Sequence, residues 1–340
     1  MNGQARIKAI FNGGAADRAG FWAGDPPDET REIYYEYFGV NDELSLSAAV
    51  GNDAVWIPAE FYAYRHPDGK KLWETEGTRG RKARDAAGIF AEYGTVKEIE
   101  NFDWPNPEYL DFSDVLARMD AARKNGLAVF GGPWTYISSL ACDFFGMEDL
   151  FIKMYSNPEI VEAAIDGMVN FYLSANKKFF DIAADKLDVF FFASDLGSQE
   201  NLLLSPEMFK EFFLPGFRKI VNQAKSYGLK VMLHSCGSVE KIIPEFINIG
   251  IDALHPLQAK ARDMDAQTLS SKYKNDLVFV GGVDTQDLLP FGTPAQIKEE
   301  VRRLKKLFGA RYVVSPSHEA LLPNVSPENM LAMRDAAMED

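Results

Sequence analysis

Eight short apolar runs recur along the chain, and they constrain its fold more than any other feature. Each run has the length of a strand and is bounded by Gly, Pro or Asp. They cover residues 20–23, 54–57, 127–130, 187–193, 230–234, 253–257, 277–280 and 312–315. Most are apolar at successive positions rather than at alternate ones. This pattern is typical of parallel strands whose two faces are both buried.

Stretches with helical spacing separate these runs, and several carry a hydroxyl or carboxyl residue at their start. Ser205-Pro206 is expected to open a helix that extends to about Tyr227. Similar starts are predicted at Ser238, Asp265, Thr293-Pro294 and Ser326-Pro327, with ends near Gly228, Gly250 and Gly309. Eight strands that alternate with helices predict an α/β fold, a (β/α)8 TIM barrel, as one domain over residues 1–340.

The first half of the chain departs from this regular alternation. Residues 58–106 are long for a connection between a strand and a helix, and Asp68-Gly69 within them is a hairpin signal. We interpret this segment as an inserted hairpin and lid. The helical stretches 4–11 and 28–38 are expected to form an N-terminal extension packed outside the barrel.

The composition narrows the class of protein. Thirty-six Lys and Arg residues against 50 Asp and Glu residues give a formal net charge of −14, which argues against nucleic acid as a partner. The two cysteines do not form a disulfide framework, and the longest apolar string is far too short to span a bilayer. We therefore expect a cytoplasmic protein with no membrane segment. A homodimer is a further hypothesis.

A barrel of this type carries its active site where the carboxyl ends of the strands meet the following loops. Residues predicted at these ends to bind substrate are Trp22, Trp56, Glu60, Trp134 and Asp284. Asp195 and His318 are the predicted catalytic residues, although Asp195 could instead cap its loop. The chain lacks the sequence motifs of phosphate-binding loops, dinucleotide-binding folds and serine hydrolases.

The pair His234 and Cys236 is the most informative local feature. Residues i and i+2 of a strand project to the same side, so an imidazole and a thiol there can converge on one ion. A catalytic Zn²⁺ takes three protein ligands and keeps one position open. His318 is the predicted third ligand, with Asp195 or Glu200 as alternatives. A hydrogen-bonded structural pair without metal is the competing interpretation, and His255 and Cys142 are expected to be structural.

Aromatic residues near the second strand allow two interpretations. Trp56, Phe61, Tyr62, Tyr64 and Trp73 could form the wall of a pocket for a flat ligand. They could instead be the packing core of the insertion, and this is the interpretation that we favour.

As a set, the motifs of the second half resemble the uroporphyrinogen decarboxylase superfamily over about residues 187–337. They comprise Ala193–Gly197, Leu204–Phe209, Phe213–Pro215, Leu233–Gly237, Ile251–Gln258, Gly281–Thr285, Ser317–His318 and Pro327–Asn329. The first 180 residues are similar more loosely. Decarboxylases of this superfamily carry two arginines for substrate carboxylates just after the first strand, whereas here the chain reads Phe21–Pro27 without arginine.

The resemblance is closer to the corrinoid-linked methyltransferase branch, which includes methylcobalamin:coenzyme M methyltransferases and components of O-demethylases. In the coenzyme M enzymes a His-x-Cys pair and a later Cys bind zinc. His234 and Cys236 match the first two, but the third position resembles Ser317-His318. The resemblance implies zinc as cofactor, with a corrinoid supplied by a partner corrinoid-binding protein.

Three hypotheses follow. The first is a zinc-assisted methyltransferase that moves a methyl group between a small donor or thiol and the cobalt of a corrinoid protein. The second is a lyase that decarboxylates a tetrapyrrole or a related carboxylic acid. The third is a barrel that binds a corrinoid or a partner without catalysis.

Overall fold

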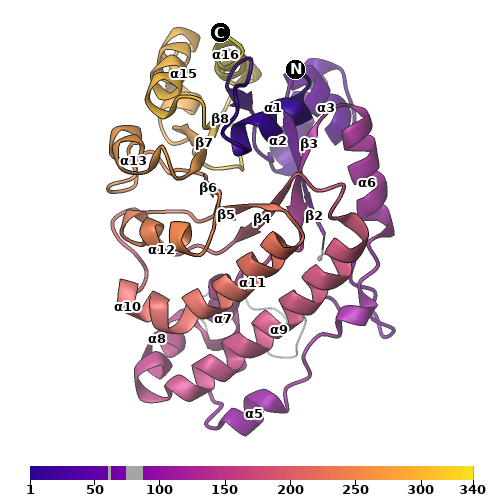
Figure 1. Cartoon of the computed structure of the whole chain (residues 1–340), viewed down its shortest axis with the longest axis vertical. Helices are drawn as coiled ribbons and strands as arrows, with labels where there is room; N and C mark the ends of the chain where they lie inside the picture. The colour runs from indigo at the N-terminus through magenta and orange to yellow at the C-terminus, as the bar shows by residue number, and fades with distance from the viewer. Residues whose placement is uncertain (60–62, 74–86, 340) are drawn as a thin grey trace.

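The computed structural model describes residues 1–59, 63–73 and 87–339, and its centre is a ring of eight parallel strands (Figure 1). The strands are β1 (Gly20–Phe21), β2 (Ala54–Pro58), β3 (Ala128–Gly132), β4 (Val189–Ala193), β5 (Lys230–His234), β6 (Ala253–His255), β7 (Val278–Val283) and β8 (Tyr312–Pro316). Their order is β1-β8-β7-β6-β5-β4-β3-β2, so β1 pairs with the last strand. The prediction of a (β/α)8 barrel is confirmed.

The seam between β1 and β2 is closed by the residues that precede β2. The Asp53 amide donates to the Phe21 carbonyl at 2.8 Å, and the Phe21 amide donates to the Asp53 carboxylate at 2.9 Å. The Ala23 amide donates to the Asn52 side chain at 2.8 Å. A side-chain carboxylate thus replaces part of a strand ladder at this point.

Helices surround the strands. The helices between the start of the chain and β4 are α1 (Gly3–Phe11), α2 (Asp28–Phe38), α3 (Glu43–Val50), α5 (Val96–Glu100), α6 (Ser113–Lys124), α7 (Ile137–Phe145), α8 (Met147–Ser156) and α9 (Pro158–Ala183). After β4 come α10 (Pro206–Met208), α11 (Leu214–Ser226), α12 (Ile243–Asn248), α13 (Ala266–Tyr273), α14 (Leu288–Phe291), α15 (Pro294–Phe308) and α16 (Pro327–Ala337). Among the described residues, no helix has the length and apolarity needed to span a bilayer.

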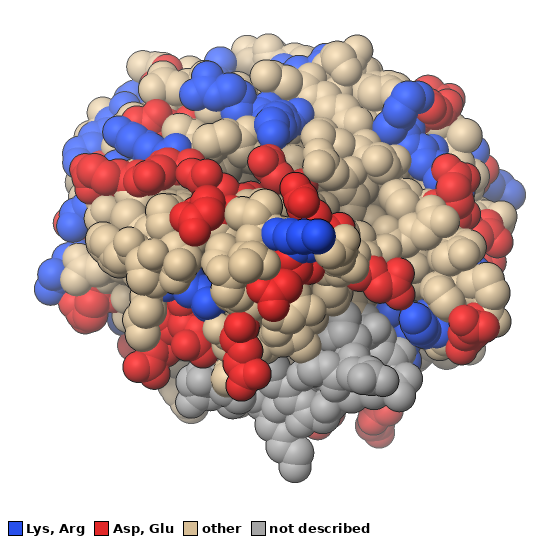
Figure 2. Space-filling model, turned by 90° about the horizontal axis from the view of Figure 1, so that it is seen from below, with Lys and Arg blue, Asp and Glu red and all other residues tan. Residues whose placement is uncertain are grey.

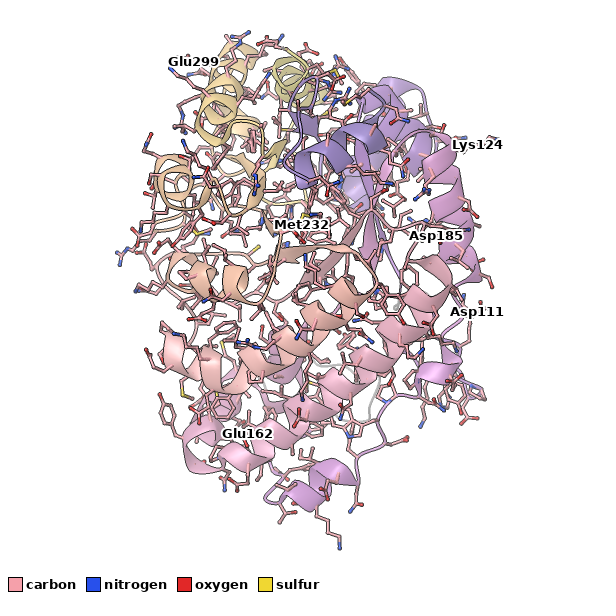
Figure 3. The ribbon with its side chains drawn as sticks, viewed as in Figure 1. Asp111, Lys124, Glu162, Asp185, Met232 and Glu299 are labelled. Carbon is pink, nitrogen blue, oxygen red and sulfur yellow. The ribbon has the colours of Figure 1, made fainter. Side chains whose placement is uncertain are left out.

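The alternation of side chains along β4 shows why its sequence is apolar on both faces. Val189 and Phe191 belong to the cluster inside the barrel, whereas Phe190 and Phe192 belong to the layer between strands and helices. Phe192 packs edge-on against Phe217 of α11, with ring centroids 5.6 Å apart. Met232 of β5, labelled at the centre of Figure 3, also lies inside the barrel. Both sides of β4 are therefore buried, as the sequence predicted for most of the strands.

The predicted N-terminal extension is wrong in two respects. Helix α1 closes the amino end of the barrel, because Ile7, Ile10 and Phe11 join the interior cluster rather than an outer surface. The Gln4 amide donates to the Gly126 carbonyl, which lies just before β3. Helix α2 follows β1 and is a connecting helix of the barrel itself. An amphipathic helix buries its apolar face wherever apolar surface is open, and here that is the bottom of the barrel.

Most of the predicted helix starts are confirmed. The side chains of Ser205, Asp265, Thr293 and Ser326 each accept a hydrogen bond from a backbone amide of the first turn. Ser238 is the exception, since α12 begins only at Ile243, after a short 3₁₀ turn over 240–242. The Ser238 amide is instead bound to the Ser198 carbonyl at 2.7 Å. Ser238 therefore joins the loops after β4 and β5 instead of capping a helix.

The helix expected from Ser205 to about Tyr227 is present, but residues 209–213 form a π-helical segment just before Pro215. Proline has no amide hydrogen to donate to the preceding turn, so the regular α-helical pattern is interrupted there.

The segment between β2 and α6 differs in part from the expected hairpin. The Gly69 amide donates to the His66 carbonyl at 2.9 Å, so a turn does form at Pro67-Asp68. Tyr64, however, forms its antiparallel bridge with Leu110. Trp73 is 7% exposed and packs edge-on against Phe171 of α9 at 4.7 Å. This supports packing over a ligand pocket for Trp73, whereas Phe61 and Tyr62 lie outside the described residues.

Charges of both signs are distributed over the surface. Figure 2 shows Asp and Glu side chains mixed with Lys and Arg on the face seen from below the view of Figure 1. Such mixing keeps opposite charges adjacent despite the net charge of −14.

Candidate functional site

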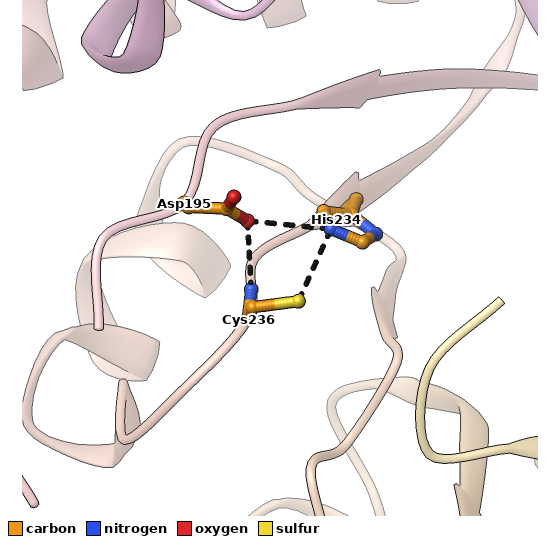
Figure 4. Close-up of side chains that lie close together, drawn as sticks. All are labelled: Asp195, His234 and Cys236. Carbon is orange, nitrogen blue, oxygen red and sulfur yellow. Dashed lines mark hydrogen bonds and ion pairs between the residues drawn. The ribbon is translucent and has the colours of Figure 1, made fainter. Parts of the chain in front are cut away.

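The carboxyl ends of β4 and β5 bring three predicted residues together (Figure 4). His234 is the last residue of β5 and has the same parity along the strand as Met232, so its side chain faces the barrel interior. Cys236 follows two residues later, and Asp195 follows β4, whose Ala193 is in register with His234. Because parallel strands end at the same edge, these side chains share one site.

The distances between their polar atoms are those of ligands around one ion. His234 Nε2 lies 3.4 Å from Cys236 Sγ and 3.3 Å from Asp195 Oδ1. Zinc binds nitrogen at about 2.0–2.1 Å and sulfur at about 2.3 Å, so two tetrahedral ligands lie roughly 3.3–3.6 Å apart. The three ligand atoms all lie within 4.8 Å of one another. We call Asp195, His234 and Cys236 the Nε2 group, and its atoms fit a zinc ion.

The other ring nitrogen of His234 faces a second group. His234 Nδ1 lies 3.0 Å from His255 Nδ1 and 3.5 Å from Glu319 Oε2. His255 ends β6 in register with His234, while Glu319 follows β8. These ligand atoms also lie within 4.8 Å of one another, and we call His234, His255 and Glu319 the Nδ1 group.

Backbone packing holds the loops of the Nε2 group in place. The Cys236 amide donates to Asp195 Oδ1 at 3.1 Å. Gly237 has a φ of +81°, and a Cβ there would lie 2.3 Å from the carbonyl carbon of Gly197. Only glycine permits so close an approach in the left-handed region. The glycine after Cys236 therefore lets the loops after β4 and β5 contact each other directly.

Without a bound metal ion, the electrostatic environment favours a charged imidazole and a thiolate, and a metal ion that binds His234 would displace the proton of the imidazole. Burial by itself would lower the pKa of His234, but Glu319, Asp195 and Cys236 together raise that pKa well above its usual value. Burial would raise the pKa of Cys236, yet the imidazoles of His234 and His318 lower it overall. His255 is fully buried, and burial followed by its two histidine neighbours holds its pKa well below the usual range. A lowered thiol pKa favours the form of cysteine that binds metal.

His318, the predicted third ligand, lies beside the Nε2 group. Its ring centroid is 6.4 Å from that of His234, and a hydrogen bond with Cys236 raises its pKa. The His318 Nδ1 accepts a hydrogen bond from the Ala320 amide at 3.1 Å. It is not among the residues of either group, whereas Asp195, the alternative ligand, is.

The three predicted tryptophans lie at different depths. Trp22 is 1% exposed and packs 5.3 Å from His255, so it supports the floor of the site. Trp56 and Trp134 are partly exposed above it, with ring centroids 4.8 Å apart at 60°. Trp134 also lies 5.7 Å from His234. The upper two rings therefore form an apolar wall beside the imidazole.

Asp284 and Glu200 have polar partners outside the two groups. The Asp284 carboxylate accepts hydrogen bonds from the amides of residues 286–288, which is the arrangement of a loop cap. Glu200 forms an exposed ion pair with Arg262 at 2.9 Å. Cys142 is buried in α7, as expected. Glu60, predicted to bind substrate, lies outside the described residues.

The structure places two residues beside His234 that the sequence did not indicate there. His255 was interpreted as structural, and Glu319 was not considered, although it directly follows His318. The signal available for His255 was its equivalent position at the end of the strand after β5. For Glu319 the only signal was its place just beyond β8, since its contact with His234 joins elements far apart in the sequence.

The profile of the uroporphyrinogen decarboxylase (URO-D) family matches residues 88–339 of this chain. Among curated proteins, the chain is 27% identical over 211 residues to the methylated-thiol–coenzyme M methyltransferase of Methanosarcina mazei, which covers 60% of this chain and 53% of that protein. It is 23% identical over 219 residues to the methylcobamide:CoM methyltransferase MtbA of the same organism, covering 62% and 60%. The matches thus span little more than half the length of these relatives.

Among solved structures, the chain is similar to a methyltransferase from Methanosarcina mazei. The TM-score is 0.71 at 18% sequence identity, and the superposition covers 99% of this chain and 98% of the other. At this identity the likeness shows that the two chains share a fold.

Proposed function

Because the chain belongs to the uroporphyrinogen decarboxylase family, we propose that it is a methyltransferase that acts with a corrinoid protein. It would move a methyl group between a small donor or thiol and the cobalt of the corrinoid, with a zinc ion held by His234 and Cys236. The observation that carries the proposal is the convergence of His234 Nε2 and Cys236 Sγ, 3.4 Å apart, at the mouth of the barrel.

The donor atoms suit zinc. A neutral imidazole nitrogen and a thiolate sulfur are typical zinc ligands, and a carboxylate oxygen is a common third. Asp195 is the candidate for that third place within the Nε2 group, and His318 is the alternative beside Cys236. Zinc bound here would supply a Lewis acid that activates a thiol or polarises the oxygen of a methoxy group.

The protein groups around this position have separate tasks in the proposal. Asp195 both faces His234 and holds the Cys236 amide, so it fixes the loop that carries the thiolate. Trp56 and Trp134 would exclude water and pack against the apolar part of the substrate. Asp195 or His318 could also move a proton to or from the substrate.

Charge at the mouth argues against the decarboxylase alternative. A substrate with many carboxylates needs cationic partners to leave water. Arg31 of α2, the first arginine after β1, is already paired with Asp25 at 2.6 Å and with Asp28 at 2.9 Å. Glu319 and Asp195 add negative charge close to His234.

The partner, the methyl donor and the cellular location are part of the proposal. The corrinoid would come from a separate corrinoid-binding protein, in line with the methylcobamide named for the relative MtbA. A cytoplasmic location and a homodimer stay sequence-based predictions.

The test combines metal analysis with turnover. Purified protein is assayed for zinc and for methyl transfer with free cob(I)alamin and a panel of methoxyarenes, methylamines and thiols, followed by the cobalamin spectrum. We expect about one zinc per chain, and loss of zinc and activity in His234→Ala. His66→Ala is the matched control, because His66 lies at the turn of residues 66–69, outside the two groups.

Three results would contradict the proposal. The first is wild-type protein without zinc together with unchanged activity in His234→Ala. The second is metal-independent decarboxylation of a porphyrinogen. The third is tight binding of a corrinoid protein with no methyl transfer from any donor, which would favour the non-catalytic hypothesis.

A further inference from the structure

We infer that Glu319, assisted by His255, is a positioning residue that fixes the tautomer and orientation of His234 for metal binding at Nε2. The inference rests on the proposed function, because it assumes an ion in the Nε2 group. It assigns a task to a carboxylate that the ligand set leaves unused. Two acceptor atoms face His234 Nδ1, namely His255 Nδ1 at 3.0 Å and Glu319 Oε2 at 3.5 Å.

A neutral imidazole carries a single proton, on one of its two ring nitrogens. A histidine that binds a metal through Nε2 uses that lone pair, so its proton must sit on Nδ1. A buried N–H needs an acceptor, and metal-binding histidines usually donate their other N–H to a carboxylate or a carbonyl. For His234 the available acceptors are His255 Nδ1 and Glu319 Oε2.

Glu319 is suited to this task because its inner oxygen is buried and otherwise unused. The side chain is 19% exposed, and within the described residues its Oε2 has no hydrogen-bond partner. His234 Nδ1 lies 3.5 Å from this oxygen, and His318 Nδ1 lies 3.7 Å from it. Because His318 Nδ1 already accepts the Ala320 amide, His234 Nδ1–H is the donor better placed to satisfy the carboxylate. A bond to an ionised acceptor is about twice as strong as a neutral one, so Glu319 should add more than His255.

The backbone around Glu319 is fixed by the loop after β1. The Asp25 amide donates to the Glu319 carbonyl at 2.9 Å. Gly24 has a φ of +81°, and a Cβ there would lie 2.3 Å from the same carbonyl oxygen. The two loops therefore pack directly on each other, and the position of Glu319 is set before any metal binds.

His255 sets the plane of the His234 ring from the other side. Its ring is held between Trp22 at 5.3 Å and Phe191 at 5.2 Å, and the register of β5 and β6 places it next to His234. If His234 donates from Nδ1, then His255 Nδ1 must accept, so the His255 proton sits on Nε2, a buried atom with no hydrogen-bond partner among the described residues. One donor thus serves two acceptors, and Nε2 of His234 is left free for the ion.

The test measures metal binding rather than turnover. Zinc affinity is determined by competition with a chromogenic chelator, and the Co²⁺-substituted protein is characterised by its visible absorption bands. We expect Glu319→Gln to keep one ion per chain, to bind it about 10–100-fold more weakly, and to shift the Co²⁺ bands. Glu319→Asp retains the negative charge, so its zinc affinity should lie between those of wild type and Glu319→Gln. This second variant also keeps the test valid if Glu319→Gln fails to fold.

Glu245→Gln is the matched control. Glu245 has a similarly exposed side chain, at 21%, but is paired with Lys210 at 2.8 Å. Its substitution should leave zinc affinity within about 2-fold of wild type.

The outcomes separate the two proposals. Zinc affinity and Co²⁺ bands in Glu319→Gln equal to those of wild type would overturn the positioning role while the proposed function stands. Two ions per chain in wild type, with one lost in Glu319→Gln, would also overturn it, because Glu319 would then be a ligand of a second ion in the Nδ1 group. A wild-type protein that binds no divalent ion would refute the proposed function and this inference with it.

Discussion

The two ends of the barrel both bury ionisable side chains, but they satisfy them in opposite ways. At the amino end, Arg6 and Arg18 bind the carboxylate of Asp53, which is 2% exposed, at 2.5 and 2.8 Å. The same carboxylate also accepts the Phe21 amide. At the carboxyl end, three carboxylate or thiol groups surround one imidazole, and buried atoms such as His255 Nε2 have no hydrogen-bond partner among the described residues.

This difference distinguishes buried groups that stabilise the fold from buried groups that bind a ligand or take part in a reaction. A buried charge with a complete set of partners stabilises one arrangement of the chain, here the seam between β1 and β2. Incomplete sets of partners are costly and are retained where a ligand or a reaction uses them. The amino end should therefore govern stability, and the carboxyl end should govern binding.

The largest effect is expected at the amino end. Asp53→Asn removes the charge that Arg6 and Arg18 share. Arg18 loses its carboxylate partner in a largely buried site, whereas Arg6 keeps its ion pair with Asp17. Removing one partner of a buried ion pair costs about 3–5 kcal/mol. Urea unfolding should show this loss, while zinc affinity of the folded protein should not change. A loss of zinc affinity comparable to the loss of stability would break the comparison between the two ends.

Cys236→Ala is expected to show the opposite of Asp53→Asn, with a large loss of zinc affinity and little loss of stability. Loss of an outer partner of a metal ligand weakens binding about 10–100-fold, so loss of a ligand should cost more than about 100-fold. Stability of the metal-free protein should change by less than about 1 kcal/mol, because the thiol is only partly buried. Chelator competition and urea unfolding of the apo form measure the two quantities. Unaltered zinc affinity would place the ion elsewhere.

Trp134→Leu sharpens the assignment of the aromatic wall. Aromatic contacts are worth about 0.5–1.5 kcal/mol beyond their buried area, so KM for the methyl substrate should rise roughly 2–10-fold. Zinc content should stay unchanged, since Trp134 contacts the His234 ring at 5.7 Å but offers no ligand atom. Steady-state kinetics with the best donor provide the measurement. A fall in kcat with KM unchanged would contradict a role in substrate binding.

The smallest effect concerns Asp17, at the edge of the amino-end cluster. Hydrogen bonds from Arg6 and from the N-terminal amine hold its pKa well below the usual range. A lowered folded-state pKa means that the stabilisation is present above the unfolded pKa of about 3.9 and is lost as the pH falls through the folded value. Asp17 is 41% exposed, so solvent screening limits its contribution at pH 7 to less than about 1 kcal/mol.

Urea unfolding of Asp17→Asn and wild type at several pH values tests this pH dependence of the free energy of unfolding. The difference in stability should be constant near neutral pH and should shrink below about pH 4. A difference that grows on acidification would have the wrong sign.

Much of the fold could be predicted because its signals are local. All eight strands were found from their apolar runs, and Ser205, Asp265, Thr293 and Ser326 cap helices where their sequences indicated. The wrong predictions involve long-range contacts. Ser238 is bound by the loop after β4, and α1 enters the barrel because the interior was open at that end.

The candidate site was predicted only where its signals are local. His234 and Cys236 could be paired from the two-residue period of a strand, and the structure adds Asp195 at 3.3 Å. Glu319 could not be found, since its carboxylate reaches His234 only through packing of the loops after β1 and β8.

The sequence by itself determined the barrel and the pairing of one imidazole with one thiol, because strand length, burial and side-chain parity repeat over a few residues. Only the tertiary structure decided which residue faces which nitrogen of His234. Those contacts join β4, β5, β6 and the loop after β8, and their geometry depends on strand register and loop packing between segments that are distant along the chain.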